Sequence, residues 1–407
     1  MDASTKSQVP DVPSPPARPG VALTLAIAFL AFCGGVPLVQ AAREIFVQKR
    51  APLVLDLFQR LPGKATLHGW DSAQCDNSWL AERVRNPMLQ LRWDLFRDAG
   101  SKALVGKDDW LFYAPDIQYL ARPSLDDSRF YQGRFDTIFK GRRVFLEDPT
   151  IAIVDFRNQL KAMGIELLVV PVPTKASIHP YLLNPQLRQI PSSPTLVLID
   201  RLRRAGVPTV DLFHPMLAHS AHPLYLRQDT HWNPDGVSIA ANVISDTIKQ
   251  RIAPPSVPYH FTLHDTAISR WGDIAEMTKL PRRHEIWGNQ KIQISKVVDT
   301  QGHPYHDASG ARILWLGDSY SRIYQTDAPG SAGIIARVAQ RLEEPLQSIV
   351  NDGGASIKVR ETLARHPERL RGVKLVVWEF VERDIRFGEG GWRPVNLSRN
   401  INGGSHE

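Results

Sequence analysis

The stretch "ARILWLGDSYSRIY", residues 311–324, carries the clearest information about the fold. Its apolar first half has the composition of a strand buried in a parallel sheet, and Gly317 ends that strand directly before Asp318 and Ser319. In open α/β folds, functional groups gather beyond the carboxyl ends of such strands. The stretch therefore predicts an α/β protein in which the Ser319 hydroxyl is a candidate nucleophile.

Segments on both sides of this stretch alternate between strand and helix patterns. We expect strands at 165–173, 207–213, 346–351 and 373–380, and helices at 150–164, 234–252 and 357–366. This alternation is typical of a flavodoxin-type parallel sheet flanked by helices. Residues 253–306 are broken by prolines and do not follow the alternation, so we expect an insertion near the site or a binding loop.

The N-terminal region has two parts of contrasting composition. Residues 1–20 are rich in Pro and Ser and are expected to be disordered, whereas residues 21–39 carry no charge over about the length that spans a bilayer. The apolar run is interpreted either as an uncleaved signal anchor over 21–41 or as a signal peptide cut near Ala41. Both interpretations place the rest of the chain outside the cytoplasm, and a buried helix of a soluble protein is a third possibility.

The remaining chain divides, by composition, into a helical lead-in at 42–104, a catalytic domain at 105–390 and a flexible tail at 391–407. The net charge is +7, but the basic residues are scattered among 42 acidic ones, which excludes a nucleic-acid-binding arm. The two cysteines, Cys33 and Cys75, indicate neither a disulfide framework nor a Cys-rich metal site. We expect no cofactor and no metal.

The stretch "YLRQDTHWNPDG", residues 225–236, offers the base that a serine nucleophile needs. A hydroxyl attacks only when a base takes its proton, and an imidazole performs this best when a carboxylate fixes its tautomer. Asp229 and His231 stand two residues apart and supply both groups. The predicted catalytic set is Ser319, His231 and Asp229.

Other residues near these motifs have more than one interpretation. Asp318 fits a turn residue, Ser321 fits a helix cap, and "NDGGASI" at 351–357 fits either an anion-binding turn or an ordinary strand-to-helix connection. Aromatic and basic side chains beside the motifs are candidates for substrate contact, although aromatics there are as often simple packing. These candidates are Arg322, Trp232, Tyr320, Tyr324 and Trp271.

Five motifs occur in order between residues 105 and 387: "GKDDWLF", "VPVPTKASIHPYL", "QDTHWNPDG", "GDSYS" and "WEFVER". Together they resemble the alginate O-acetyltransferase-like branch of the SGNH/GDSL hydrolase superfamily. The resemblance implies a periplasmic enzyme that acetylates an alginate- or cellulose-like exopolysaccharide, with Ser319 as nucleophile, His231 as base and Asp229 as its orienting group. It also implies a membrane-bound O-acyltransferase as the partner that supplies acetyl.

The sequence departs from ordinary SGNH hydrolases in two respects. The Asp-His motif precedes the serine instead of following it, and the usual oxyanion Asn has no clear counterpart. The predicted oxyanion donors are therefore the Ser319 backbone N–H with Gly353 or Asn351. A carbohydrate acetylesterase would use the same groups with water as acceptor, and a non-catalytic polysaccharide-binding protein would not need all three catalytic residues.

Overall fold

The computed structural model describes residues 19–56, 63–130, 138–139, 142–143, 148–188 and 193–397. Contacts divide the chain into two compact units, Met1–Leu91 and Arg92–Glu407. The expectations for residues 1–18 and 398–407 lie outside the described residues.

The first unit is helical. It contains α1 (Pro19–Phe46), the 3₁₀ turn η1 (Leu53–Leu55), α3 (Lys64–Asn77) and the start of α4 (Trp79–Phe96). The most apolar window of the Gly20–Phe46 segment has a mean hydropathy of 2.2, and none of it is buried against the protein. It is therefore long and apolar enough to cross a membrane, as expected from the charge-free run.

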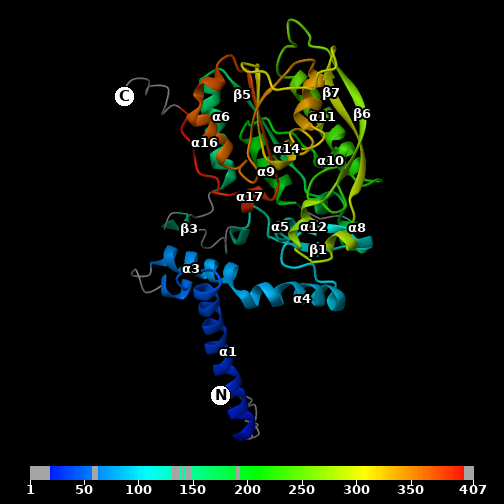
Figure 1. Ribbon diagram of the computed structural model, residues 1–407. Coiled ribbons are helices and arrows are strands. Elements are labelled where there is room, and N and C mark those ends of the chain that lie inside the picture. The colour runs from blue at the N-terminus through cyan, green and yellow to red at the C-terminus, as the bar shows by residue number, and fades with distance from the viewer. Residues whose placement is uncertain are drawn as a thin grey trace, which may run out of the picture. The chain divides into compact units, whose positions relative to one another are not determined.

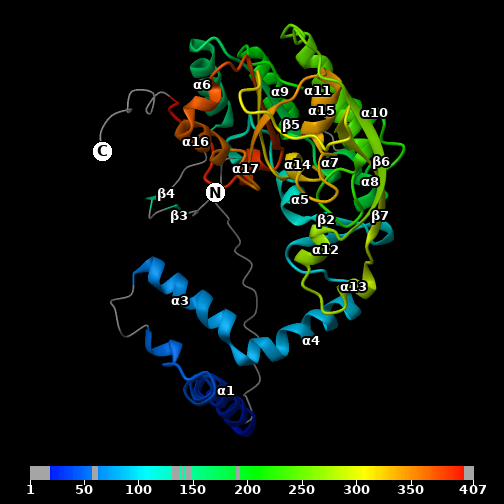
Figure 2. The same cartoon turned by 45° about the horizontal axis from the view of Figure 1, so that its top comes forward.

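The second unit is built on a four-stranded parallel sheet in the order β5 (Glu166–Val172), β10 (Leu375–Val381), β8 (Ile313–Gly317) and β9 (Gln347–Val350). Helices α11 (Pro234–Lys249) and α15 (Ile334–Leu342) share one buried core with one face of the sheet, and α6 (Pro149–Ala162) and α16 (Lys358–Arg365) share a second core with the other (Figures 1 and 2). The predicted parallel sheet flanked by helices is confirmed.

The remaining elements of this unit are short, apart from α9 and the two long strands β6 and β7. They are β1 (Ala103–Val105), η2 (Lys107–Asp109), β2 (Leu111–Tyr113), α5 (Ala114–Leu120), η3 (Ser128–Phe130), β3 (Ile138–Phe139), β4 (Arg142–Arg143), α7 (Lys175–Ile178), α8 (Pro180–Leu183), α9 (Pro194–Arg204), α10 (Phe213–Ala218), β6 (Phe261–Arg270), α12 (Asp273–Met277), α13 (Arg283–Ile286), β7 (Gln290–Asp299), α14 (Ser319–Arg322), η4 (Pro367–Leu370) and α17 (Asp384–Phe387).

The strand predicted at 207–213 is wrong. This segment makes only an isolated parallel bridge, Thr209 to Val169 of β5. Pro208 has no N–H to donate. The Asp211 carboxylate accepts from the Phe213 N–H at 2.9 Å and so turns the chain into α10, and the extended backbone ends after a few residues.

Residues 253–306 form a ribbon rather than an irregular loop. Its strands β6 and β7 pair antiparallel from Phe261↔Asp299 to Arg270↔Gln290. Ile292, Ile294 and Val297 of β7 are buried in the core that α11 and α15 share. Helices α12 and α13 lie in the connection between the strands, and this connection brings residues 270–273 to the loop that carries Asp229.

Candidate active site

The corner after β8 is fixed by the carboxylate of Asp318. Its Oδ1 accepts from the Tyr320 N–H at 2.8 Å and so caps α14, while its Oδ2 accepts from the Val381 N–H at 2.8 Å. These bonds join the ends of β8 and β10. They leave Ser319 half-buried at the first position of α14, where a backbone N–H has no acceptor within the helix.

The glycine of the corner is required by the protein's own packing. A Cβ at Gly317 would lie 2.1 Å from Ser321 Oγ and 2.8 Å from Glu379 Oε2. Ser321 Oγ donates to Glu379 at 2.5 Å and accepts from Trp315 Nε1 at 2.7 Å. Ser321 therefore joins the corner to Trp315 of β8 and Glu379 of β10 through its hydroxyl. The helix-capping role that we expected for Ser321 belongs to Asp318. Burial and the charge of Asp318 raise the pKa of Glu379 well above its usual value.

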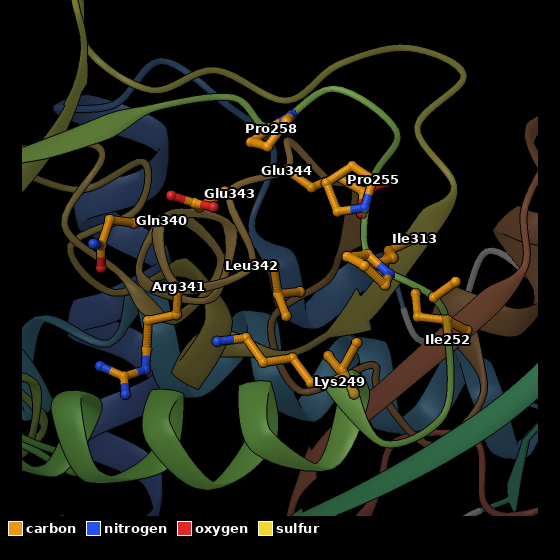
Figure 3. A pocket seen from close by; sticks show the side chains of 13 residues that line it. Lys249, Ile252, Pro255, Pro258, Ile313, Gln340, Arg341, Leu342, Glu343 and Glu344 are labelled. Atoms are coloured by element: carbon orange, nitrogen blue, oxygen red, sulfur yellow. The ribbon is translucent and has the colours of Figure 1, made fainter.

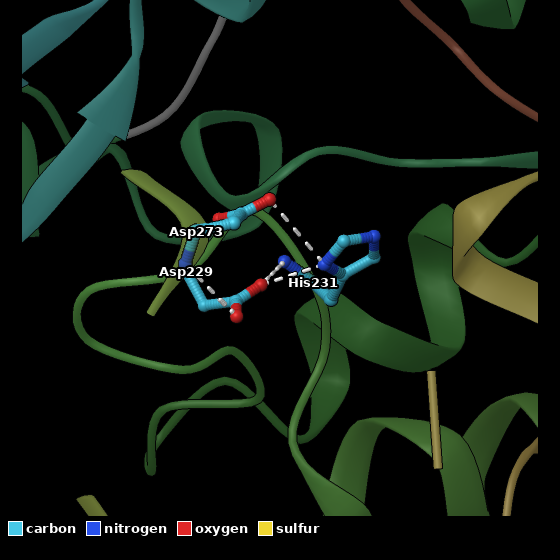
Figure 4. A group of neighbouring side chains, drawn as sticks. All are labelled: Asp229, His231 and Asp273. Carbon is cyan, nitrogen blue, oxygen red and sulfur yellow. Dashed lines mark hydrogen bonds and ion pairs between the residues drawn. The ribbon is translucent and has the colours of Figure 1, made fainter. Parts of the chain in front are cut away.

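Asp229 and His231 are buried and face each other. His231 Nδ1 lies 2.6 Å from Asp229 Oδ1, which also accepts from the His231 backbone N–H at 3.0 Å. The carboxylate therefore holds the proton on Nδ1. The other ring nitrogen, Nε2, points away from the carboxylates (Figure 4) and has no hydrogen-bond partner among the described residues.

Arg270 at the end of β6 and Asp273 at the start of α12 complete this group, and no motif in the sequence indicated either residue. Asp229 Oδ2 accepts from Arg270 Nε and from the Asp273 N–H, each at 3.3 Å. Asp273 in turn accepts from the Thr230 N–H and hydroxyl, each at 2.7 Å, and its Oδ2 lies 3.7 Å from His231 Nδ1 (Figure 4). The only signal in the sequence was the irregular composition of 253–306.

The electrostatics of the group favour a charged Asp–His pair. Burial raises the pKa of Asp229, but His231, Arg270 and the hydrogen bonds outweigh it, so the net pKa is depressed. Burial lowers the pKa of His231, but Asp229 outweighs this and the net pKa is raised. Burial and the charge of Asp229 raise the pKa of Asp273. Asp229 is thus the ionised member that stabilises a protonated imidazole.

The same three side chains have the composition of a metal site, since their ligand atoms lie within 4.8 Å of one another. The carboxylates of Asp229 and Asp273, however, already accept several N–H and O–H groups, and the positive Arg270 lies against Asp229. A guanidinium beside the same carboxylate opposes cation binding. The arrangement suits an imidazole base.

Tyr320 connects the base to the serine corner. Its hydroxyl donates to the Thr230 carbonyl at 2.7 Å, and its ring centroid lies 4.9 Å from that of His231. His231 therefore packs on the residue directly after Ser319. The Ser319 hydroxyl has no hydrogen-bond partner among the described residues, so it and His231 Nε2 are both available to a substrate.

Three candidates for substrate contact lie in the core. Trp232, Tyr320 and Tyr324 each have 0% exposure, and the rings of Trp232 and Tyr320 pack edge to face with centroids 5.2 Å apart. Aromatic side chains on a catalytic loop can face either the substrate or the core, and here all three rings are packed in the apolar core. The Tyr320 and Tyr324 hydroxyls donate to the Thr230 and Trp232 carbonyls, so these two rings tie the loop to the corner.

Arg322 and Trp271 are more accessible. Arg322 pairs with Asp327 and, at 2.8 Å, with Asp352, and it lines a cavity of about 610 Å³ together with Lys296 and other polar side chains. Trp271 is half-buried, donates from Nε1 to Glu276 at 3.1 Å, and stacks on the ring of His284 with centroids 4.1 Å apart. Trp271 is the first residue of the connection that also holds Asp273.

The two predicted oxyanion donors other than the Ser319 N–H, Asn351 and Gly353, both follow β9. The Asn351 N–H donates to the Gly317 carbonyl at 3.0 Å, so Asn351 follows β9 beside the glycine that ends β8. Gly353 lies in the following turn, which the Gly354 N–H closes onto the Asn351 carbonyl at 3.0 Å. Its positive φ of 62° explains the glycine by backbone geometry.

A buried lysine supports the loop that carries the base. Lys175 Nζ donates to the Leu111 carbonyl at 2.6 Å and to the Arg227 carbonyl at 3.3 Å, and it lies over the rings of Trp110 and Phe112. Burial lowers the pKa of Lys175 to about 7, although Asp229 and nearby carboxylates act to raise it. Lys175 of "VPVPTKASIHPYL" thus links "GKDDWLF", through Leu111, to the loop that carries Asp229, through Arg227.

A cavity of about 620 Å³ lies at the other end of the sheet. Ile313, the first residue of β8, lines it with Ile252, Pro255, Leu342 and neighbouring side chains (Figure 3). Four residue steps of about 3.3 Å separate Ile313 from Gly317, which places this cavity about 13 Å or more from the serine corner. It is therefore separate from the candidate active site.

Comparisons with known proteins show the family and the fold of the chain. Residues 103–382 match the family model described as an SGNH hydrolase-like domain, acetyltransferase AlgX. The probable alginate O-acetylase AlgJ of Pseudomonas putida is 24% identical over 353 residues, which cover 81% of this chain and 83% of that protein. The alginate biosynthesis protein AlgX of Pseudomonas aeruginosa is 34% identical over 100 residues, 23% of this chain and 21% of that protein. The solved O-acetyltransferase domain of Pseudomonas putida AlgJ has the same fold, with a TM-score of 0.53 and 20% identity over 70% of this chain and 92% of that domain.

Proposed function

The chain belongs to the family of AlgX-type SGNH hydrolase-like acetyltransferase domains, as its five motifs predicted, and on this premise we propose that it transfers acetyl groups to hydroxyls of an exopolysaccharide through an acetyl–Ser319 intermediate. The observation that carries the proposal is the buried Asp229–His231 pair, whose Nε2 is unpartnered among the described residues and whose ring packs on Tyr320, next to Ser319.

In the first half-reaction, Ser319 Oγ attacks the acetyl carbonyl while His231 Nε2 takes the hydroxyl proton. The ionised Asp229 stabilises the resulting imidazolium, and the negative carbonyl oxygen is held by the Ser319 N–H and the Asn351 side chain. The imidazolium then returns its proton to the leaving group of the donor, which leaves acetyl on Ser319. Each oxyanion donor contributes about 3 kcal/mol to lowering the barrier.

In the second half-reaction, a sugar hydroxyl attacks the acetyl–Ser319 ester. His231 Nε2 takes the proton of that hydroxyl and passes it to Ser319 Oγ as the ester breaks, so the enzyme is regenerated. Bulk water competes for the same ester, and a bound sugar outcompetes it only through the effective concentration that a binding groove provides. Trp271 supplies a half-buried aromatic surface for such a groove.

We also propose the location and partners of the enzyme. The relatives named above act in alginate biosynthesis, which supports an acidic, alginate-like polymer as acceptor. The apolar helix α1 supports anchoring in the inner membrane with the catalytic unit in the periplasm. A membrane-bound O-acyltransferase would then deliver the acetyl groups across the membrane.

The experiment supplies the enzyme with a chromogenic acetyl ester and oligosaccharide acceptors. Mass spectrometry then measures how much acetyl is found on the oligosaccharide and how much is released as acetate. We expect the right oligosaccharide to divert acetyl from water to sugar, and Trp271→Ala to lower the transferred fraction more than total ester cleavage. Tyr259→Ala, at an exposed aromatic in the segment before β6, is the matched control. Free acetate as the only product with every acceptor would instead support a carbohydrate acetylesterase.

A further inference from the structure

The "WEFVER" motif places an arginine at the rim of the candidate active site. The Val381 N–H is bonded to Asp318, and Arg383 follows two residues later. Its guanidinium carbon lies 5.9 Å from the ring centroid of Tyr320 and 5.2 Å from that of Tyr113, and its side chain is 13% exposed. Because His231 packs on the same Tyr320 ring, Arg383 lies within electrostatic reach of the base.

The guanidinium of Arg383 is only partly engaged. Nη1 donates to Asp116 Oδ1 at 3.0 Å, and this is its one hydrogen bond among the described residues. A guanidinium carries five N–H donors arranged as a fork, and the single bond to the buried Asp116 leaves the edge formed by Nε and Nη2 unused. That edge has the geometry that pairs with a second carboxylate.

Tyr113 provides a hydroxyl next to this edge. It ends β2, is half-buried, and its hydroxyl has no hydrogen-bond partner among the described residues. The Tyr113 ring lies against the Arg383 guanidinium, and the charges of Arg383 and Asp273 both act on its hydroxyl. Neither the Asp–His pair nor the serine corner uses Arg383 or Tyr113 in the reaction described above.

We propose that Arg383 and Tyr113 bind the carboxylate of an acidic sugar in the acceptor chain and so set its hydroxyl against acetyl–Ser319. The inference rests on the proposed function, which already gives an acidic polymer as acceptor, and adds the two residues that recognise its carboxylate. Asp116 holds the guanidinium from behind, and the open edge of the fork receives the sugar carboxylate. A neutral sugar in the same place would leave that edge without its ionic partner.

The experiment compares an oligouronate with the same oligomer after reduction of its carboxyl groups, both as acceptors from a chromogenic acetyl ester. We expect Arg383→Gln to lower the ratio of kcat/KM for the charged over the neutral acceptor by about 10- to 100-fold, since a hydrogen-bonded charge pair is lost. Tyr113→Phe, which keeps the Arg383–Asp116 pair, should lower the same ratio about 3- to 10-fold. Arg371→Gln, at an exposed arginine before the opposite end of β10, is the control and should leave the ratio unchanged.

An equal loss with charged and neutral acceptors, in both Arg383→Gln and Tyr113→Phe, would overturn the inference and assign Arg383 to holding Asp116 or to stabilising the oxyanion. Binding measured by calorimetry tests the inference without turnover. In a Ser319→Ala background, the oligouronate should bind more tightly than its reduced form, and Arg383→Gln should remove the difference. Equal binding of both oligomers by Ser319→Ala would also overturn the inference. Preferential binding of the oligouronate, together with no acetyl transfer by the wild-type enzyme, would contradict the proposed function alone.

Discussion

The serine corner and the base group are held in different ways. The corner lies at the end of a buried strand, and its contacts are short bonds among Asp318, Ser321, Trp315 and the ends of two strands. The base group lies on a loop, and charged residues from a distant ribbon surround it, with Arg270 and Asp273 against Asp229. The corner should therefore respond to changes of shape, and the base group to changes of charge and pH.

Among the three variants that compare the base group with the corner, Asp229→Asn should lower activity most, because it removes the negative charge that fixes the imidazole tautomer. We expect kcat/KM for an acetyl ester to fall about 1,000- to 10,000-fold. The raised pKa of His231 keeps the wild-type enzyme poorly active below that pKa, where the base is protonated. Without Asp229 the pKa falls, so the acidic limb of the residual activity should move to lower pH in a kcat/KM profile.

Asp211→Asn is the matched control for this prediction. Asp211 pairs with the exposed His214 at 2.5 Å outside the candidate site, and its replacement should change neither the rate nor the pH profile. A pH profile for Asp229→Asn that superimposes on the wild-type profile would contradict the account of the base group.

Gly317→Ala tests the corner. The new methyl group would overlap Ser321 Oγ and Glu379, and overpacking of this kind costs about 1–3 kcal/mol. We expect a matching loss in the free energy of unfolding measured with denaturant, with little change in the pH dependence of the remaining activity. Gly288→Ala, where no atom lies within 4 Å of the new Cβ, should be close to neutral. Equal stabilities of the two variants would be incompatible with the packing described here.

Asp273→Asn should have the smallest effect. The amide oxygen can still accept from Thr230, but the second negative charge near His231 Nδ1 is lost. We expect kcat/KM to fall about 3- to 10-fold and the acidic limb to move to lower pH by less than in Asp229→Asn. Asp265→Asn, on the exposed part of β6, controls for the charge change. A loss larger than that of Asp229→Asn would make Asp273 the orienting carboxylate.

The same contrast explains which parts of the site could be predicted from the sequence. The corner and the Asp229–His231 pair are local patterns, and both stand out because polar residues follow an apolar strand or lie two positions apart. Arg270 and Asp273 approach the pair only because β6 and β7 form a ribbon, and no local pattern encodes that pairing. Trp232, Tyr320 and Tyr324 were predicted to meet the substrate but are buried, because the packing around the loop decides which way an aromatic ring faces.

The most direct test of the central claim is mass spectrometry of the enzyme during turnover of an acetyl ester without acceptor. The account predicts an acetyl group on the peptide that contains Ser319, its removal when an acceptor oligosaccharide is added, and its absence in Ser319→Ala, whose turnover should fall at least about 1,000-fold. Undiminished transfer by Ser319→Ala, or acetyl on another residue that passes to the sugar at the rate of turnover, would contradict the account.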